Sequence, residues 1–217
     1  MPKVKIYKKW YPTEKDSKFI RFVCLSDTHN KLDRIAVPEG DILIHAGDYT
    51  NKNTLDEIIK FADDMAKLPH KYKIIVPGNH DLKNDICYTN ELIERIPNCF
   101  FLYDNTITIN GIKIYGTPAL RDQTFTLPDR MDVLITHSPP YGILDISRKK
   151  LNGEHGGNPD LTTQLDELKY KPKVHVFGHI HEGYGYNKIN NVMYINAANC
   201  NLYHRPNNKP IIFDLKI

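Results

Sequence analysis

Five short apolar segments of this chain each lead into residues that can bind a metal ion. Runs rich in β-branched residues and bounded by Gly, Pro or Asp are typical of buried strands. Open sheets place their chemistry just beyond the carboxyl ends of such strands. Five ligand-type sites in order therefore predict a metal centre assembled on strand tips. The segments and the residues that follow them are 22–25 before Asp27 and His29, 42–44 before Asp48, 74–76 before Asn79 and His80, 133–135 before His137, and 174–177 before His179 and His181.

Length and charge set the broad class of the protein. A chain of 217 residues predicts a single domain over residues 1–217. The formal charge of +3, with no dense block of Lys or Arg, argues against a nucleic-acid partner. No run approaches the ~20 apolar residues of a membrane span, and the N-terminal stretch lacks the apolar segment of a signal peptide. The sequence indicates no oligomeric state.

The cysteines indicate the compartment. They form no Cys-x-x-Cys pair, which is typical of small buried thiols in a reducing environment rather than of a disulfide framework. We therefore expect a cytoplasmic enzyme. The four are Cys24, Cys87, Cys99 and Cys200.

The secondary-structure signals predict a mixed α/β fold. Residues 54–68 predict a helix that begins with a Thr54–Glu57 capping box, and shorter helices are expected over 90–96 and 161–168. Hairpins are expected around Asn110-Gly111 and Asn190-Asn191, and a last strand over 211–217. This order implies a mixed sheet, or two packed sheets, with helices outside. The apolar face of the first helix would contain Leu55, Ile58, Ile59, Ala62, Met65 and Ala66.

The candidate ligands combine oxygen and nitrogen donors without a thiolate. In an extended segment residues two apart share a side, so Asp27-Thr28-His29 and His179-Ile180-His181 would each direct two ligands to one place. Seven ligands exceed the need of one ion, and two divalent ions sharing a carboxylate ~3.5–4 Å apart fit better. Manganese is the first expectation, with iron, zinc and magnesium as alternatives. The seven are Asp27, His29, Asp48, Asn79, His137, His179 and His181.

Charge counting connects this site to phosphoryl chemistry. Two divalent ions bring four positive charges and Asp27 and Asp48 bring two negative ones, so the site attracts an anion. A metal-bound water is the expected nucleophile for in-line attack. His80 is the expected donor to the leaving oxygen, with Asp81 as its orienting partner. Taken alone, Asp48 also fits a turn residue and Asn79 an Asx-turn.

These motifs, as an ordered set, resemble those of the calcineurin-like metallophosphoesterases. They are Asp27-x-His29, Gly47-Asp48, Gly78-Asn79-His80-Asp81, Thr136-His137 and Gly178-His179-x-His181. Flanking residues resemble the small branch of metallophosphoesterase-domain-containing, cyclic-nucleotide-phosphodiesterase-like proteins. These flanks include Ser26-Asp27-Thr28-His29, Thr136-His137-Ser138-Pro139-Pro140 and Asn196-Ala197-Ala198-Asn199.

The resemblance implies a four-layer αββα sandwich and a division of the ligands between two ions. One ion would be held by Asp27, His29, Asp48 and His181. Asp48 would bridge to a second ion, held also by Asn79, His137 and His179. His80 would be the catalytic histidine.

Further positions are candidates for substrate contact. Asn79 and His80 stand within the metal motifs, and His155 lies in a glycine-rich loop between motifs. Asn199 and Arg205 are candidates for contact with phosphate or base. His45 and His175 lie inside apolar runs and are expected to be core histidines. His70 and His204 are assigned no role.

The leading functional hypothesis is a dinuclear phosphodiesterase for small nucleotides such as cyclic AMP or cyclic GMP. The same site suits a phosphomonoesterase, a phosphoprotein phosphatase or a nuclease. A different class of protein, a metal-scaffolded binding module without catalysis, also stays open.

Overall fold

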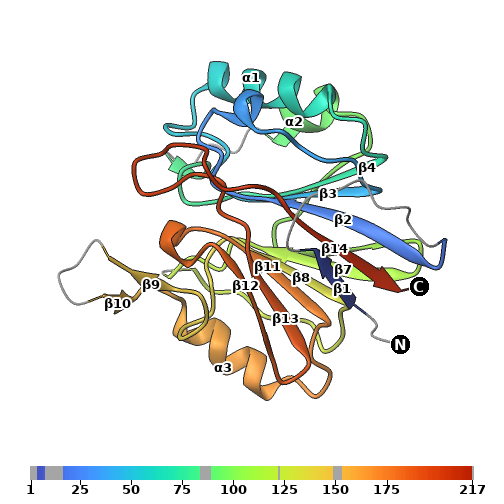
Figure 1. Ribbon diagram of the computed structural model, residues 1–217, viewed down its shortest axis with the longest axis vertical. Helices are drawn as coiled ribbons and strands as arrows, with labels where there is room; N and C mark the ends of the chain where they lie inside the picture. The colour runs from blue at the N-terminus through green and yellow to red at the C-terminus, as the bar shows by residue number, and fades with distance from the viewer. Residues whose placement is uncertain (1–3, 8–16, 84–88, 122, 149–152, 217) are drawn as a thin grey trace.

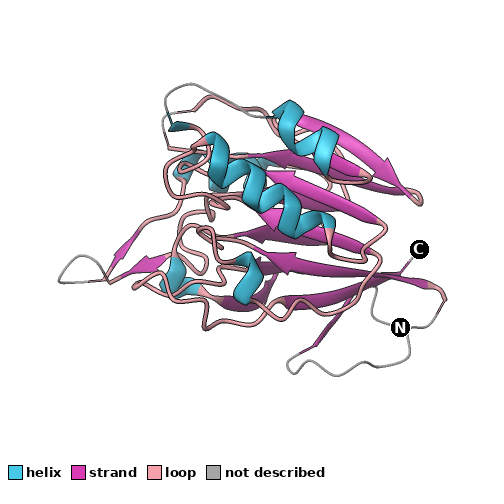
Figure 2. Ribbon diagram, turned by 90° about the horizontal axis from the view of Figure 1, so that it is seen from above, coloured by secondary structure: helices cyan, strands magenta, loops and turns pink. Residues whose placement is uncertain are grey.

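Two six-stranded sheets lie face to face, and helices cover the outer side of each sheet (Figure 1). This computed structural model describes residues 4–7, 17–83, 89–121, 123–148 and 153–216. Figure 2 shows helices packed over the strands in a view from above. The expected four-layer αββα arrangement is confirmed. The helices are α1 (Leu55–Ala66) and α2 (Thr89–Arg95) on one side and α3 (Pro159–Glu167) on the other.

The first sheet has the order β1-β14-β2-β3-β4-β5, and β2 to β5 are parallel. β14 is antiparallel to both of its neighbours. Because the central strands run the same way, the loops leaving β2, β3 and β4 emerge at one edge of the sheet. The strands are β1 (Val4–Tyr7), β2 (Phe19–Leu25), β3 (Ile42–Ala46), β4 (Tyr72–Val76), β5 (Cys99–Phe101) and β14 (Ile211–Lys216).

The second sheet has the order β12-β13-β11-β8-β7-β6, with a parallel centre and an antiparallel hairpin at each edge. Both predicted hairpins are confirmed. Asn110, Gly111, Asn190 and Asn191 all have positive φ, as type I′ turns require. The strands are β6 (Asn105–Ile109), β7 (Ile112–Thr117), β8 (Val133–Thr136), β11 (Val174–Phe177), β12 (Gly185–Ile189) and β13 (Val192–Asn196).

Three apolar cores hold the layers together. Residues of β2 alternate between two of them: Phe22 and Cys24 pack between the sheets, whereas Val23 and Leu25 pack under α1 and α2. The rings of Phe22 and Phe213 stack with their centroids 4.5 Å apart. A third core joins the second sheet to α3. Because strands buried on both faces need apolar residues at every position, the strands appear in the sequence as continuous apolar runs.

The predicted apolar face of α1 is partly wrong. Ile58, Ala62 and Met65 are buried as expected, but Leu55 is 43% exposed and Phe61 is buried in its place. With about 100° of rotation per residue, Leu55 and Phe61 lie on opposite flanks of the stripe formed by the other three. The large ring of Phe61 packs on Tyr49, with the centroids 4.4 Å apart.

Other differences concern short elements and boundaries. The third helix begins at Pro159, earlier than expected, because Asn158 caps it by accepting a hydrogen bond from Leu161 N. Strands β1 and β5 and the small antiparallel pair β9 (Ile146–Ser147) and β10 (Glu154–His155) were not predicted. Ile217, placed in the last strand, lies outside the described residues. No helix in the described part of the chain combines the length and apolar character needed to span a bilayer.

Replacing Thr54 by Ala tests the capping box of α1. The Thr54 hydroxyl accepts a hydrogen bond from Glu57 N at 3.4 Å, and its loss is expected to lower the free energy of unfolding by about 1 kcal/mol. In a domain of this size the thermal midpoint would fall by about 2–4 °C. Circular dichroism measures the midpoint, and Thr54→Ser, which keeps the hydroxyl, is the matched control. An equal loss of stability in both variants would show that the Thr54 hydroxyl does not cap α1.

Candidate active site

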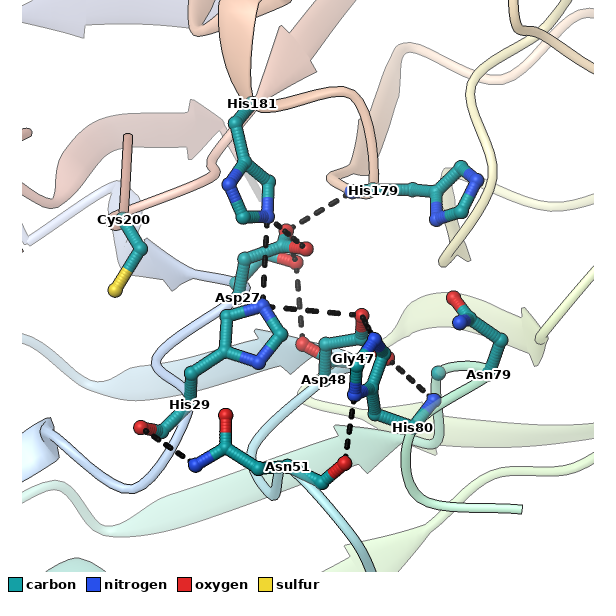
Figure 3. A network of polar contacts seen from close by, with 12 residues as sticks. Asp27, His29, Gly47, Asp48, Asn51, Asn79, His80, His179, His181 and Cys200 are labelled. Carbon is teal, nitrogen blue, oxygen red and sulfur yellow. Dashed lines mark hydrogen bonds and ion pairs between the residues drawn. The ribbon is translucent and has the colours of Figure 1, made fainter. Parts of the chain in front are cut away.

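All seven predicted metal ligands converge where the loops of both sheets meet. Asp27 and His29 follow β2, Asp48 follows β3, and Asn79 follows β4. The second sheet contributes His137 after β8, and His179 and His181 after β11. Figure 3 shows the imidazoles of His29, His80 and His181 close to the two carboxylates, with Asn79 and His179 on the other side.

The backbone reaches the site through turns, so the expected extended geometry of the two triplets is wrong. Asp27, His29, Asp48 and His179 have φ values of 53°, 44°, 55° and 64°. Left-handed conformations are uncommon outside glycine and concentrate at functional sites. His181 begins a short 3-10 helix, η3 (His181–Gly183). Tight turns therefore bring Asp27 and His29 into one ligand group, whereas His179 and His181 belong to different groups, which the triplet spacing did not predict.

Glycine permits the close approach of these loops. Gly47 has φ of +96°, and a Cβ atom there would overlap the His137 ring. A Cβ atom on Gly178 would overlap Ser26 and the Asp27 carboxylate. The space next to these ligands is therefore available only without a side chain.

Three-residue ligand groups form the two ends of the site. One contains Asp27, His29 and His181, and the other contains Asp48, His137 and His179; a third group shares His29 and Asp48 with them and adds His80. In the first, His181 Nε2 lies 3.1 Å from Asp27 Oδ1 and 3.4 Å from His29 Nε2.

In the second group, His137 Nε2 lies 3.4 Å from Asp48 Oδ1 and 3.1 Å from Asn79 Oδ1. The other Asp48 oxygen, Oδ2, lies 3.9 Å from His29 Nε2, so this carboxylate faces both groups. Donors bound to one ion at about 2.1 Å are about 3.0–3.4 Å apart. The spacing within each group therefore fits a divalent ion.

Backbone carbonyls orient the imidazoles. Nδ1 lies 2.9 Å from Ala46 O in His137, 2.9 Å from Asn201 O in His181 and 3.3 Å from Thr50 O in His29. A carbonyl can only accept, so the proton sits on Nδ1 and the lone pair of Nε2 faces the site in the neutral ring. Metal-ligating histidines are typically oriented in this way. The donor set therefore fits metal ions by orientation as well as by distance.

Burial and charge oppose each other at the carboxylates. Burial would raise the pKa of Asp27, but the hydrogen bond from His181 and the charge of His137 hold it well below its usual range. Burial likewise opposes ionisation of Asp48, yet His137 lowers the pKa of Asp48 to about 2. Both side chains are therefore charged near neutral pH while almost fully buried. A desolvated pair of like charges is a strong site for cations.

The pKa values of the histidines depend on which charged groups lie beside them. Burial lowers the pKa of His29 and of His179 to about 4, so both are neutral near pH 7 and ready to bind a metal. Burial also opposes the charge on His137, but Asp48 raises the pKa of His137 to about 10. Without metal, His137 therefore carries the proton that neutralises part of the carboxylate charge.

His80 lies at the edge of the metal ligands. Its backbone N–H donates to Asp48 Oδ1 at 2.8 Å, and its Nε2 lies 4.0 Å from Asp48 Oδ2. Its Nδ1 lies 2.8 Å from Asn51 O. Lys83 Nζ donates to the same carbonyl at 2.7 Å. The orientation leaves Nε2 of His80 facing the site.

The orienting role predicted for Asp81 is corrected by the structure. Its buried carboxylate accepts from Gly78 N at 2.9 Å, Thr50 N at 2.9 Å and Thr50 Oγ1 at 2.7 Å. It therefore ties the loop after β3 to the loop after β4. The Nδ1 atom of His80 is instead oriented by the carbonyl of Asn51.

The substrate candidates separate into two kinds. His155 lines a cavity that also touches Asn79 and His179. Asn199 does not fit a substrate contact, because it is fully buried and its amide bonds Ser26 N at 3.3 Å and Asn208 O at 3.2 Å. Arg205 is exposed on the loop that follows Asn201.

His45 and His175 are core histidines, as predicted. Both are fully buried, and their Nε2 atoms lie 2.9 Å from Thr28 Oγ1 and 2.8 Å from Thr136 Oγ1. Burial lowers the pKa of each to about 3, so they are neutral.

Sequence reasoning missed His204. Its ring lies 4.3 Å from that of His29 and 5.6 Å from that of His181, measured between centroids. The carbonyl that orients His181 belongs to Asn201 in the same loop. No strand precedes His204 directly, so the strand-tip pattern contained no signal for it.

Metal binding is expected to release protons. Coordination needs the lone pair of His137 Nε2, but the pKa of about 10 keeps that ring protonated near neutral pH. The metal must displace this proton, so the apparent affinity should rise as pH increases, by about tenfold per unit for each proton displaced. Calorimetry with Mn²⁺ in buffers of different ionisation enthalpy counts the protons. A pH-independent affinity without proton release would contradict the assignment.

Asp81→Asn is expected to lower the free energy of unfolding by about 1–3 kcal/mol. An amide offers one acceptor oxygen where the carboxylate offers two, so at least one buried N–H of Gly78 or Thr50 loses its partner. Urea unfolding measures the change, with the exposed Asp129→Asn as control. Equal stability of the two variants would show that Asp81 does not hold the loops together.

Comparisons with known proteins agree with the motifs. Residues 20–183 match the family Calcineurin-like phosphoesterase. Metallophosphoesterase domain-containing protein 1 of Homo sapiens is 36% identical in an alignment that covers 91% of this chain and 71% of that protein. A UPF0046 protein of Caenorhabditis elegans is 35% identical in an alignment that covers 93% of this chain and 77% of that protein.

Among solved structures, the chain is similar to that of a novel archaeal phosphodiesterase. The TM-score is 0.49 at 19% identity, over 83% of this chain and 85% of that chain. The family match over most of the chain, together with the converging ligands, settles the class. This chain belongs to the calcineurin-like phosphoesterase family and is a metal-dependent phosphoester hydrolase.

Proposed function

We propose that this protein is a dinuclear phosphodiesterase that hydrolyses small nucleotides such as cyclic AMP or cyclic GMP. The observation that carries the proposal is the pair of ligand groups that Asp48 faces from its two oxygens. One ion would be held by Asp27, His29, Asp48 and His181, and the other by Asp48, Asn79, His137 and His179. Manganese remains the first expectation because the donors mix carboxylate, amide oxygen and imidazole.

The charge of the site supports an anionic substrate. Two divalent ions against the carboxylates of Asp27 and Asp48 leave a surplus of about two positive charges. When bound, the ions polarise the phosphoryl group and lower the pKa of the water that serves as nucleophile. A cavity of about 710 Å³ touches Asn79 and His179, and this space supports a diester, which carries a second organic group.

His80 supports departure of the leaving group. The Asn51 carbonyl accepts from Nδ1 and so holds the ring with Nε2 toward the substrate. A protonated Nε2 would donate to the leaving oxygen. The backbone N–H of His80 donates to Asp48 Oδ1, so the position of the donor is fixed relative to the carboxylate of Asp48.

The thiols support a cytoplasmic location. Cys24, Cys99 and Cys200 are free cysteines. Burial raises the pKa of the Cys99 thiol to about 12 and that of Cys200 to about 11, so neither thiol is reactive. Cys87 lies outside the described residues.

His80→Ala is expected to lower kcat for a nucleotide diester by about 10²–10⁴ while metal content is retained, because the seven candidate ligands stay in place. His80→Gln keeps a hydrogen-bond donor without a transferable proton and should lie close to the Ala variant. Elemental analysis of each variant is the control. Unchanged turnover in His80→Ala would exclude the role of proton donor.

The diester preference is tested by comparing bis-nitrophenyl phosphate with the mono-ester on Mn²⁺-loaded protein. We expect a higher kcat/KM for the diester, because the cavity beside Asn79 accepts the second organic group. A preference for the mono-ester would favour a phosphomonoesterase. Tight nucleotide binding with no turnover of either compound would favour a binding module.

A further inference from the structure

A buried carboxylate holds His155 at the wall of the cavity beside the metal ligands. His155 Nδ1 lies 2.7 Å from Asp145 Oδ1, and Asp145 is fully buried. The other oxygen, Oδ2, accepts from Gly142 N and Gly157 N, each at 3.0 Å. The ring of Tyr141 packs on His155 with the centroids 4.9 Å apart. His155 therefore has a defined position although it is partly exposed.

The carboxylate also selects the tautomer of His155. An ionised carboxylate can only accept, so the proton of the neutral ring sits on Nδ1. Nε2 is then the ring nitrogen that can meet a ligand in the cavity. A histidine with this orientation can accept a hydrogen bond when neutral and donate one when protonated.

The element that contains His155 is connected to the loop after β11, which contains His181. β9 and β10 form a two-stranded arm in which His155 pairs with Ile146 (Figure 1). Glu182, the residue after the ligand His181, accepts from Arg148 N at 2.6 Å. This hydrogen bond therefore connects the arm to the loop that contains His181.

A second connection lies behind the arm. Asn196 Nδ2 donates to Leu144 O at 3.1 Å and to Ile180 O at 2.9 Å. These carbonyls belong to the residues just before Asp145 and just before His181. One amide therefore connects the Asp145–His155 pair to the loop after β11 and sets their relative position.

The cavity has the size and chemistry of a nucleoside site. Its volume of about 710 Å³ lies within the range of about 300–1,000 Å³ typical of small-molecule sites. Besides His155, its lining residues include Arg121, Gln123 and Tyr103, which are residue types with a guanidinium, an amide and an aromatic ring. Such groups match the flat, polar base and the hydroxyls of a nucleoside.

We infer that the Asp145–His155 pair is a subsite for the nucleoside half of the substrate, in which His155 is a positioning residue and Asp145 fixes its orientation. The inference rests on the proposed nucleotide diesterase function, because it assigns the second organic group of that substrate to this cavity. Phosphate would bind at Asn79 and His179, and the nucleoside would extend toward His155. The contact is with the group that the phosphate carries and not with the metal ions.

Comparing the binding of a nucleotide with that of inorganic phosphate distinguishes this subsite from the metal site. On Mn²⁺-loaded protein, His155→Ala is expected to weaken 5′-GMP binding about tenfold, as the loss of one ligand hydrogen bond would do. Binding of inorganic phosphate and metal content should change by less than about twofold. His155→Gln, which places an amide near the position of Nε2, should recover part of the loss. Calorimetry measures both ligands.

Asp145→Asn tests the orienting carboxylate. It should also weaken the binding of 5′-GMP without changing the binding of inorganic phosphate. Asp160→Asn, at an exposed position in the first turn of α3, is the matched control. If Asp145→Asn fails to fold, the two His155 variants decide the matter alone. If His155→Ala weakened the binding of 5′-GMP and of phosphate equally, or weakened neither, the subsite would be overturned.

Kinetics distinguish failure of the subsite from failure of the proposed activity. With thymidine 5′-nitrophenyl phosphate as substrate, His155→Ala should raise KM about tenfold and leave kcat within about threefold. With the same substrate, the exposed control Asp160→Asn should leave both constants near the wild-type values. Wild-type turnover combined with binding insensitive to His155 overturns the subsite only. Selective loss of 5′-GMP binding in a protein without turnover overturns the diesterase activity only.

Discussion

The two buried carboxylates of Asp27 and Asp48 are the constraint on which the site depends. Both are almost fully removed from solvent at the place where loops from the two sheets meet. Burying two like charges is unfavourable unless positive charge lies close to them. The imidazoles around them, and above all His137, meet this need in part. The site is therefore expected to bind cations strongly, as a metal-dependent hydrolase requires.

Backbone hydrogen bonds hold these carboxylates and imidazoles in place. Asp27 N donates to Gly47 O at 2.8 Å, and Gly178 N donates to His137 O at 3.0 Å, so neighbouring loops of each sheet are joined. His179 N donates to Asp27 Oδ2 at 2.9 Å and connects the two sheets. Because the groups that hold the ligands are backbone atoms of packed loops, the site needs little reorganisation.

Two histidines outside the ligand set are oriented by different acceptors. His80 is held by the carbonyl of Asn51, and His155 is held by the carboxylate of Asp145. The first stands beside Asp48, whereas the second lines the cavity beyond Asn79. In the function that we propose, His80 serves the leaving oxygen and His155 the nucleoside. Reaction and recognition would then be assigned to different histidines.

The ligands were predictable because they follow apolar runs directly. A strand buried on both faces appears in the sequence as such a run, and the loop that leaves its carboxyl end is short. Asp27, Asp48 and His137 could therefore be placed together without coordinates. The capping box of α1 was predictable for a similar reason, since Thr54 and Glu57 interact within one turn.

Positions that depend on contacts between distant segments could not be predicted. The sequence alone indicated a mixed α/β fold and seven candidate ligands through local periodicity, and its ordered motifs indicated the family, whose resemblance implied the two-sheet sandwich. Only the tertiary structure decided that Asp81 holds loops, that Asn199 is buried, and that His204 lies against His29. It also decided that Asp145 orients His155. Each of these depends on which side chain a loop turns toward its neighbours, and packing, rather than local propensity, selects that direction.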